Sequence, residues 1–197
     1  TIFITTMLLK NLINNLSPNV GKLKIRGLSL DSRNVKKGDL FISIKGNKFN
    51  ANNYIEEAIS KGAKAVVYSG SVKKKYKDII LIKVKDTRKK LAELCSKYYK
   101  NKPKNIVAVT GTNGKTSVSD FFYQIFLLEK RKVGVLGTLG FKKNKSLKKR
   151  ELTTLDSLSL NRDLNEMKKA DIDNAIIEAS SHGLHQSRLN FLNIKTG

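Results

Sequence analysis

The 197-residue sequence predicts an α/β protein, with a small mixed α/β N-terminal domain followed by a truncated P-loop-type parallel-sheet domain. Three observations predict this class. Short β-branched apolar runs, such as 106–109, are typical of buried strands. In the second half, such runs alternate with segments of helical periodicity, which favours a parallel sheet. A loop with two glycines, at 110–116, joins one of these strands to a helix.

The first half predicts strands and helices in a less regular alternation. Apolar runs predict strands at 25–30, 39–44, 63–68 and 79–82. Apolar residues at helical spacing predict helices over 6–16, 52–61 and 86–98. Pro18 ends the first helix, Gly62 ends the second, and Asp86-Thr87 caps the third.

A helix that ends against Pro103 indicates a domain boundary, which gives domains 1–101 and 102–197. The second domain predicts strands at 106–109, 132–136 and 173–177, and helices over 116–129 and 157–167. The basic stretch at 142–150 predicts a hairpin or loop. In the helix over 116–129, apolar residues fall at helical spacing at Val118, Phe121, Phe122, Ile125 and Leu128, and all of these except Ile125 form one face.

Composition limits the class of protein. The single cysteine, Cys95, excludes a disulfide framework and suits a reducing compartment, so we expect a cytoplasmic protein. It lies among apolar residues of a predicted helix, which favours core packing over catalysis. No apolar run approaches the roughly 20 residues of a membrane span, and no signal-peptide pattern is present, so we expect no membrane partner.

The formal net charge of +23 and the pI of about 10.1 are typical of a nucleic-acid-binding module. The excess is mainly lysine spread along the whole chain, as an A/T-rich codon bias also produces. The clusters at 73–75 and 142–150 lack the interleaved aromatic residues of a stacking platform. We therefore expect no nucleic-acid partner, although steep salt dependence of binding to random DNA would favour that alternative. A positive field favours anionic substrates.

The loop Gly111-Thr112-Asn113-Gly114-Lys115-Thr116 has the chemistry of a phosphate cradle. Loop amides and a helix N-terminus attract an anion, Lys115 reaches the terminal phosphates, and the Thr116 hydroxyl can hold Mg²⁺. The general P-loop pattern needs glycine at position 109, where this chain has Val109, so the loop is the shorter G-x-x-G-K-T. The alternative is a turn with a solvated lysine; the flanking strand and helix favour nucleotide binding.

Glu178 terminates a predicted strand on the side where a doubly wound sheet binds its ligands. A carboxylate there can share a metal with Thr116, whereas the alternative is a strand-end glutamate that faces water. His182 and His185 have no third ligand of the zinc type, so we expect no structural zinc, and one histidine can lie close to Mg²⁺. The sequence contains no G-x-S-x-G elbow, which argues against a serine nucleophile.

Four motifs together resemble the Mur ligase family: Asp31-Ser-Arg33 with Gly38-Asp-Leu-Phe41, the loop at 109–116, Leu152-Thr-Thr154, and the run from Glu178 to Arg188. The last run is similar to the MurE type, which adds the third residue of the peptidoglycan stem peptide. The loop is shared with folylpolyglutamate synthetases, which remain an alternative. The sibling ligases that add the terminal dipeptide share the Asp-Ser-Arg and Gly-Asp-Leu-Phe motifs. They typically have Asn-His after the glutamate, where this chain has Ser180-Ser-His-Gly-Leu184, and this difference argues against them.

The resemblance implies an ATP-dependent acid–amino-acid ligase that uses ATP and Mg²⁺ and joins a free amino acid to UDP-MurNAc-dipeptide. It implies that 1–101 recognises the UDP-substrate and that 102–197 is part of the ATPase domain. The ATP loop is Gly111, Thr112, Asn113, Gly114, Lys115 and Thr116; the metal ligands are Thr116 and Glu178; the catalytic residues are Lys115, Glu178 and His182. The implied substrate-binding residues are Leu30, Ser32, Asn113, Thr153, Thr154, Ser180, Gln186 and Arg188, with a uridine-side loop at 47–49.

Three family features have no counterpart in these 197 residues: a carbamylated lysine near the metals, an amino-acid-selecting motif, and a third domain. The chain also starts at Thr1 and stops at Gly197 directly after an incomplete segment. We therefore expect a piece of a longer ligase that is inactive alone. The sequence leaves open whether diaminopimelate or lysine is added, and what the oligomeric state is.

Overall fold

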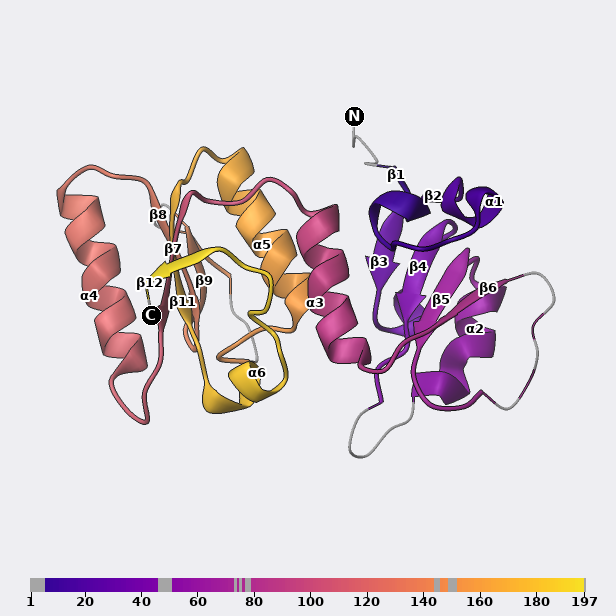
Figure 1. Cartoon of the computed structure of the whole chain (residues 1–197). Coiled ribbons are helices and arrows are strands. Elements are labelled where there is room, and N and C mark those ends of the chain that lie inside the picture. Colours follow the sequence, from indigo (N-terminus) through magenta and orange to yellow (C-terminus); the bar gives the residue numbers. More distant parts are fainter. Residues whose placement is uncertain are drawn as a thin grey trace. The chain divides into compact units, whose positions relative to one another are not determined.

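A computed structural model describes residues 6–45, 51–72, 74, 76, 79–143, 146–148 and 152–196. The chain divides into two compact units, Thr1–Tyr98 and Tyr99–Gly197 (Figure 1). The implied uridine-side loop at 47–49 and parts of the basic clusters at 73–75 and 142–150 lie outside the described residues. Among the residues that are described, no helix is long and apolar enough to cross a bilayer.

Unit 1 is built on a parallel sheet of four strands in the order β3-β4-β5-β6. The strands are β3 (Gly27–Ser29), β4 (Asp39–Ile42), β5 (Ala65–Tyr68) and β6 (Ile80–Lys83). The helical segments that follow β3 are η2 (Ser32–Asn34), η3 (Ala51–Tyr54), α2 (Ile55–Ser60) and α3 (Thr87–Tyr98). Phe41 of β4 packs with Ile55 and Ala58 of α2, so the apolar side of this helix covers the sheet.

Two expectations for the first 30 residues are wrong. In place of a helix over 6–16, the chain forms β1 (Met7–Leu8) and the 3₁₀ helix η1 (Leu9–Asn11), followed by the short α1 (Pro18–Gly21). β1 pairs in antiparallel fashion with β2 (Lys24–Ile25), and the Leu9 amide donates to the Leu23 carbonyl at 2.8 Å. This pairing overrides helical spacing, since it satisfies backbone groups while Leu9 still packs in the core.

The predicted strand at 25–30 is divided at Arg26, and the resulting strands β2 and β3 belong to different sheets. The Arg26 amide donates to the Gly38 carbonyl at 2.9 Å, so the chain turns from one sheet into the other at this residue.

Unit 2 confirms the predicted α/β class: it contains a six-stranded sheet in the order β10-β9-β8-β11-β7-β12. The strands β8, β11, β7 and β12 are parallel, and β9 and β10 form an antiparallel extension. The strands are β7 (Asn105–Val109), β8 (Val133–Gly137), β9 (Gly140–Lys143), β10 (Ser146–Lys148), β11 (Asn174–Glu178) and β12 (Ile194–Thr196). The helices are α4 (Lys115–Leu128), α5 (Ser157–Lys169) and α6 (Ser181–His185).

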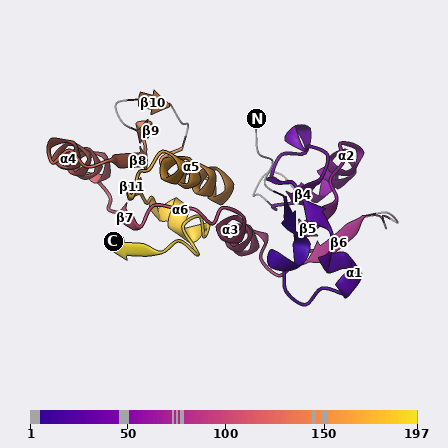
Figure 2. The same ribbon diagram turned by 90° about the horizontal axis from the view of Figure 1, so that it is seen from above.

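Helices α4 and α5 cover opposite faces of this sheet (Figures 1 and 2). Ala175 and Ile177 of β11 pack in the cluster that contains α5, while Ile176 packs with Tyr123 of α4. Such alternation is that of a strand buried on both sides. The Asp156 carboxylate caps α5 by accepting from the amides of Leu158 and Ser159 at 2.9 and 3.0 Å.

Candidate functional site

The phosphate loop lies between the end of β7 and the start of α4. Gly111 and Gly114 have φ angles of +148° and +80°, which side-chain-bearing residues rarely adopt. Gly114 is the N-cap residue of α4, so the free amides of the first helical turn face the loop. The Lys115 ammonium donates to the carbonyls of Gly111 at 2.6 Å and Thr112 at 3.2 Å. An anion in this loop would therefore meet amides and an ammonium group together.

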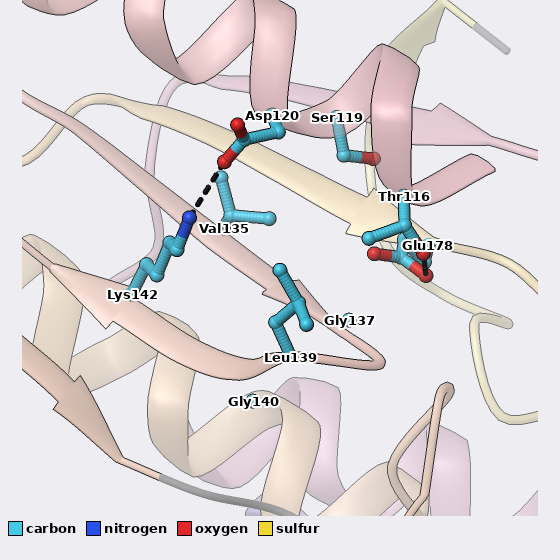
Figure 3. Close-up of a pocket in the computed structure, with 9 residues that line it drawn as sticks. All are labelled: Thr116, Ser119, Asp120, Val135, Gly137, Leu139, Gly140, Lys142 and Glu178. Atoms are coloured by element: carbon cyan, nitrogen blue, oxygen red, sulfur yellow. Dashed lines mark hydrogen bonds and ion pairs between the residues drawn. The ribbon is translucent and has the colours of Figure 1, made fainter. Parts of the chain in front are cut away.

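Glu178 lies at the carboxyl end of β11, with its side chain buried beside the start of α4 (Figure 3). Its Oε2 accepts hydrogen bonds from the hydroxyls of Thr116 at 3.1 Å and Thr138 at 2.8 Å. A Cβ on Gly137 would lie 2.2 Å from Glu178 Oε1, so only glycine leaves room for the carboxylate. Helix α4 and strands β8 and β11 thus converge on one acidic side chain.

The donor set around Glu178 fits a hard cation. Among the described residues, the hydrogen-bond partners of its carboxylate are hydroxyls, and no described lysine or arginine forms an ion pair with it. A buried carboxylate without a countercharge is costly, and a bound cation removes that cost. Within the described part of the chain, no three His, Cys, Asp or Glu side chains gather into a complete metal cage. Mg²⁺ typically takes one or two carboxylates and completes its shell with waters and phosphate oxygens.

The hollow beside Glu178 is small, about 10 Å³, and is lined by residues of α4, β8 and β9 (Figure 3). Asp120 and Lys142 form an ion pair of 2.6 Å across it, and this hydrogen bond lowers the pKa of the Asp120 carboxyl. Lys115 is not among the lining residues. Thr116 therefore meets Glu178 directly, while Lys115 lies over the loop carbonyls next to it.

A second network continues from the backbone of Glu178. The Thr154 hydroxyl donates to the Glu178 carbonyl at 2.8 Å and accepts from the Ser180 amide at 2.8 Å. The Ser180 hydroxyl caps α6 by accepting from the Gly183 amide at 3.1 Å. A Cβ on Gly183 would lie 2.7 Å from the Thr154 Cβ, so glycine is needed for this close approach. Thr154 is buried and holds the segment after β11 in place.

Arg188 completes this network. Its Nη2 and Nε donate to the Gln186 side-chain oxygen at 2.8 and 3.2 Å, and its Nη1 donates to the Thr154 carbonyl. The Gln186 amide nitrogen lies 2.6 Å from His182 Nε2. The structure therefore brings His182, Gln186 and Arg188 together on and after α6.

Sequence reasoning missed two residues of this site, Gly137 and Thr138. Thr138 Oγ1 bonds to Glu178 and also lies 3.1 Å from the Thr153 hydroxyl, so it links the two networks. The position of Thr138 in the sequence could have revealed it. Thr138 directly follows a predicted parallel strand, so its hydroxyl is expected at the same edge of the sheet as Glu178.

Leu30 and Ser32 of unit 1 line a separate cavity of about 480 Å³ where β3 ends. The Ser32 hydroxyl donates to Glu57 Oε2 at 2.5 Å. This bond and a second one from Lys61 lower the pKa of the Glu57 carboxyl. The Arg33 guanidinium lies against Asp31 at 2.8 Å and lowers the pKa of that carboxyl. Phe41 and Tyr54 supply apolar walls, so the cavity combines an apolar surface with polar groups at its rim.

Several known proteins are similar to this chain. The curated relatives include UDP-N-acetylmuramoyl-L-alanyl-D-glutamate–2,6-diaminopimelate ligases of Rickettsia montanensis (39% identical, covering 89% of this chain and 37% of the relative) and Bradyrhizobium diazoefficiens (36%, covering 97% and 40%). A solved structure of a ligase with that name is 29% identical, with a TM-score of 0.78, over 96% of this chain and 39% of its own. The ADP complex of Thermotoga maritima MurF shares the fold, with a TM-score of 0.51 at 22% identity over 78% of this chain and 32% of its own.

The chain thus spans about 37–40% of the length of these curated relatives. Family models match two segments of it: "Mur ligase family, catalytic domain" over residues 24–99 and "Mur ligase middle domain" over residues 109–197. Because these two segments together take in both units and the phosphate loop, the chain belongs to the Mur ligase family.

Proposed function

We propose that the chain supplies the ATP-binding and UDP-substrate-binding parts of a ligase that adds diaminopimelate to UDP-MurNAc-L-Ala-D-Glu in peptidoglycan synthesis. The observation that carries the proposal is the contact between Thr116 of the phosphate-loop helix and Glu178 at the end of β11. This contact links a phosphate-binding loop to a carboxylate that can bind a cation. The names of the curated relatives favour diaminopimelate over lysine.

In the proposed reaction, the substrate carboxylate attacks the γ-phosphorus of ATP, which gives an acyl phosphate and ADP. The amine of the amino acid then attacks the acyl carbon, an amide bond forms, and phosphate leaves. Stabilising crowded phosphoryl charge is most of the task. Thr116 and Glu178 would hold Mg²⁺, which when bound supplies positive charge against the phosphate oxygens. Lys115 and the α4 amides bind the phosphates from the other side.

The proposed substrate roles are those that the resemblance to the Mur ligases implies. The cavity beside Leu30 and Ser32 in unit 1 would take the uridine end of the substrate, since its apolar walls suit a base and its rim suits a ribose. Thr153, Ser180, Gln186 and Arg188 in unit 2 would bind the sugar-peptide end, and His182 would lie near the metal. Asn113 would contact both ligands from the phosphate loop. Charge favours this assignment, because the substrate and ATP are both anionic and the chain is strongly cationic.

The 197-residue chain is expected to bind ATP and UDP-linked ligands but to show no ligase turnover, because it spans little more than a third of its relatives. Calorimetry with ATP and Mg²⁺, and separately with UDP, measures binding. Phosphate release in the presence of the UDP-MurNAc-dipeptide, Mg²⁺ and diaminopimelate or lysine measures turnover, with the Rickettsia montanensis relative as positive control. Turnover by the chain alone contradicts the expectation, and absence of both binding events overturns the proposed function.

Arg188→Ala is expected to weaken binding of the UDP-MurNAc-dipeptide by about tenfold, the order of one charge-assisted hydrogen bond, and to change ATP affinity little. The reason is that the guanidinium contacts Gln186 and the Thr154 carbonyl, whereas Lys115 contacts the phosphate-loop carbonyls of Gly111 and Thr112. Calorimetry with each ligand in turn measures the two effects, and Arg162→Ala, an exposed change on α5, is the matched control. An equal loss for ATP would place Arg188 at the nucleotide instead.

A further inference from the structure

A further cavity of unit 1 lies at the opposite edge of its sheet from the cavity proposed for uridine. Its volume is about 730 Å³, which is typical of sites for small ligands. Residues that precede neighbouring parallel strands meet at one edge of the sheet. Arg26 precedes β3, Gly38 precedes β4 and Lys64 precedes β5, so all three line this cavity. Strands β1 and β2 lie beside that edge (Figure 1) and add Leu8 and Lys24 to the lining.

The lining of this cavity is basic. Lys and Arg make up 39 of the 197 residues of the chain, whereas half of the described residues that line the cavity are Lys or Arg. No described aspartate or glutamate lines it. The cavity proposed for uridine differs, because Asp31 and Glu57 line it together with Arg33. We call the four cationic residues the basic rim: Lys24, Arg26, Lys37 and Lys64.

The basic rim has no acidic partner in the part of the chain that the structure describes. None of the ion pairs formed there includes one of its four residues. Asp39 directly follows the rim residues Lys37 and Gly38 of the lining, but it is buried and accepts from the Lys36 amide at 2.9 Å. Burial raises the pKa of the Asp39 carboxyl. This side chain therefore closes the turn before β4 and does not neutralise the rim.

Backbone contacts fix the positions from which the rim side chains extend. The Arg26 amide donates to the Gly38 carbonyl at 2.9 Å, and the Lys64 amide donates to the Asp39 carbonyl at 2.8 Å. Gly38 has a φ of +100°, and a Cβ there would lie 2.9 Å from Arg26 Cδ. Glycine at this position thus allows both the turn and the close approach of the arginine stem. The fold, and not only the high lysine content, brings these cations together.

This arrangement suits an anion of high charge. A concave surface lined by one sign of charge raises the local concentration of counter-ions. Ammonium and guanidinium groups are the side-chain cations with which proteins bind phosphate. Leu8 and Leu23 are half-buried and give the cavity an apolar wall beside these cations. We propose that this cavity binds an anionic ligand with two or more phosphate groups, held by the basic rim. The proposal does not depend on the proposed ligase reaction, which uses other residues.

Binding of inorganic tripolyphosphate to the 197-residue chain tests the proposal. Because the phosphate loop can also bind this probe, calorimetry is performed on the unaltered chain and on Lys115→Ala. We expect one binding event to persist in Lys115→Ala, and Lys37→Ala combined with Lys64→Ala in that background to weaken it by at least about tenfold. Lys83→Ala combined with Lys85→Ala is the matched control. It removes two exposed lysines at the carboxyl end of β6 and should change the affinity little.

Thermal unfolding checks that each variant is folded, and the exposed rim lysines should be replaceable without loss of stability. Lys64→Glu provides a second variant, since it places an acid within the basic rim and should weaken binding at least as much as the double substitution. Loss of all tripolyphosphate binding in Lys115→Ala leaves the phosphate loop as the site and overturns the proposal. An equal loss in the Lys83 and Lys85 control attributes binding to the general positive field, and also overturns it.

Co-sedimentation with vesicles of equimolar phosphatidylcholine and cardiolipin distinguishes two sources of the phosphate groups. If the rim substitutions weaken binding to these vesicles as well as to tripolyphosphate, a lipid headgroup can supply the anion. If they affect tripolyphosphate alone, the ligand is a free solute, and both results support the proposal. Binding of random single-stranded DNA that depends on Lys37 and Lys64, without binding of tripolyphosphate, identifies a nucleic-acid site and overturns it.

Discussion

Replacing Lys115 by alanine is expected to weaken ATP binding by about 10–100-fold, both with Mg²⁺ and without it, as the loss of charge-assisted hydrogen bonds to phosphate predicts. The ammonium donates to the Gly111 and Thr112 carbonyls of the phosphate loop. When the anion binds, the lysine exchanges these neutral carbonyls for phosphate oxygens. Its contribution therefore does not require the metal.

Titration calorimetry with ATP, in Mg²⁺ and in excess chelator, measures this effect. Lys132→Ala is a suitable control, because it removes the same charge from a surface pair with Asp171 at 2.8 Å. A loss with Lys115→Ala that is seen only when Mg²⁺ is present would mean that the lysine acts through the metal. A loss of equal size in the control would mean that ATP responds to the general positive field of the chain and not to the loop.

Helices and strands were predicted correctly where the apolar periodicity agreed with the capping residues at their ends. Helix α3 was expected from apolar spacing after Asp86, and the structure shows that carboxylate accepting from the Arg88 and Lys89 amides. The helix predicted over 6–16 was wrong. The apolar spacing there is helical, but the Leu9 amide donates to the carbonyl of Leu23, which is too far along the chain for a local pattern to reveal. Local patterns carry no information about such a pairing, so a short strand here could not be anticipated.

The apolar face of α4 shows a second limit. The sequence grouped Val118, Phe121, Phe122 and Leu128 on one face, but these residues are exposed, and the buried residues of α4 are Ser119 and Tyr123. The phosphate loop fixes where α4 starts, and with it the rotation of the helix, since Gly114 must cap it and Thr116 must reach Glu178. Hydrophobic spacing alone does not reveal which face of a helix meets its own sheet.

For the candidate site, the rule that parallel strands end at one edge was sufficient to bring Thr116 and Glu178 together. It did not find Gly137, whose importance lies in the space it leaves for the Glu178 carboxylate. It also did not find Thr138, a hydroxyl that belongs to no motif.

Glu178→Gln is expected to remove most of the gain in ATP affinity that Mg²⁺ confers, a change of at least about 10–100-fold, while leaving metal-free ATP binding nearly intact. Glutamine keeps the size of the side chain and an oxygen that can accept from Thr116 or Thr138, and it fits above Gly137 as the carboxylate does. What it lacks is the negative charge that would hold a cation. The same calorimetric pair of titrations, with Mg²⁺ and with chelator, separates the two contributions. Glu129→Gln, at the far end of α4, is the control for the loss of one carboxylate.

Thermal unfolding distinguishes a metal role from a structural one. In the absence of metal, Glu178 is a buried charge satisfied by hydroxyls, so its neutral replacement should leave the chain as stable or make it more stable. A structural role predicts the opposite, because a carboxylate that organised β8, β11 and α4 would lower the melting temperature when replaced. Gly137→Ala gives an independent check, since its Cβ would displace Glu178 without changing the charge, and it should reproduce the loss of Mg²⁺-dependent affinity. If Glu178→Gln keeps the full Mg²⁺ gain, the carboxylate is not a metal ligand, and the contact between Thr116 and Glu178 only anchors the helix.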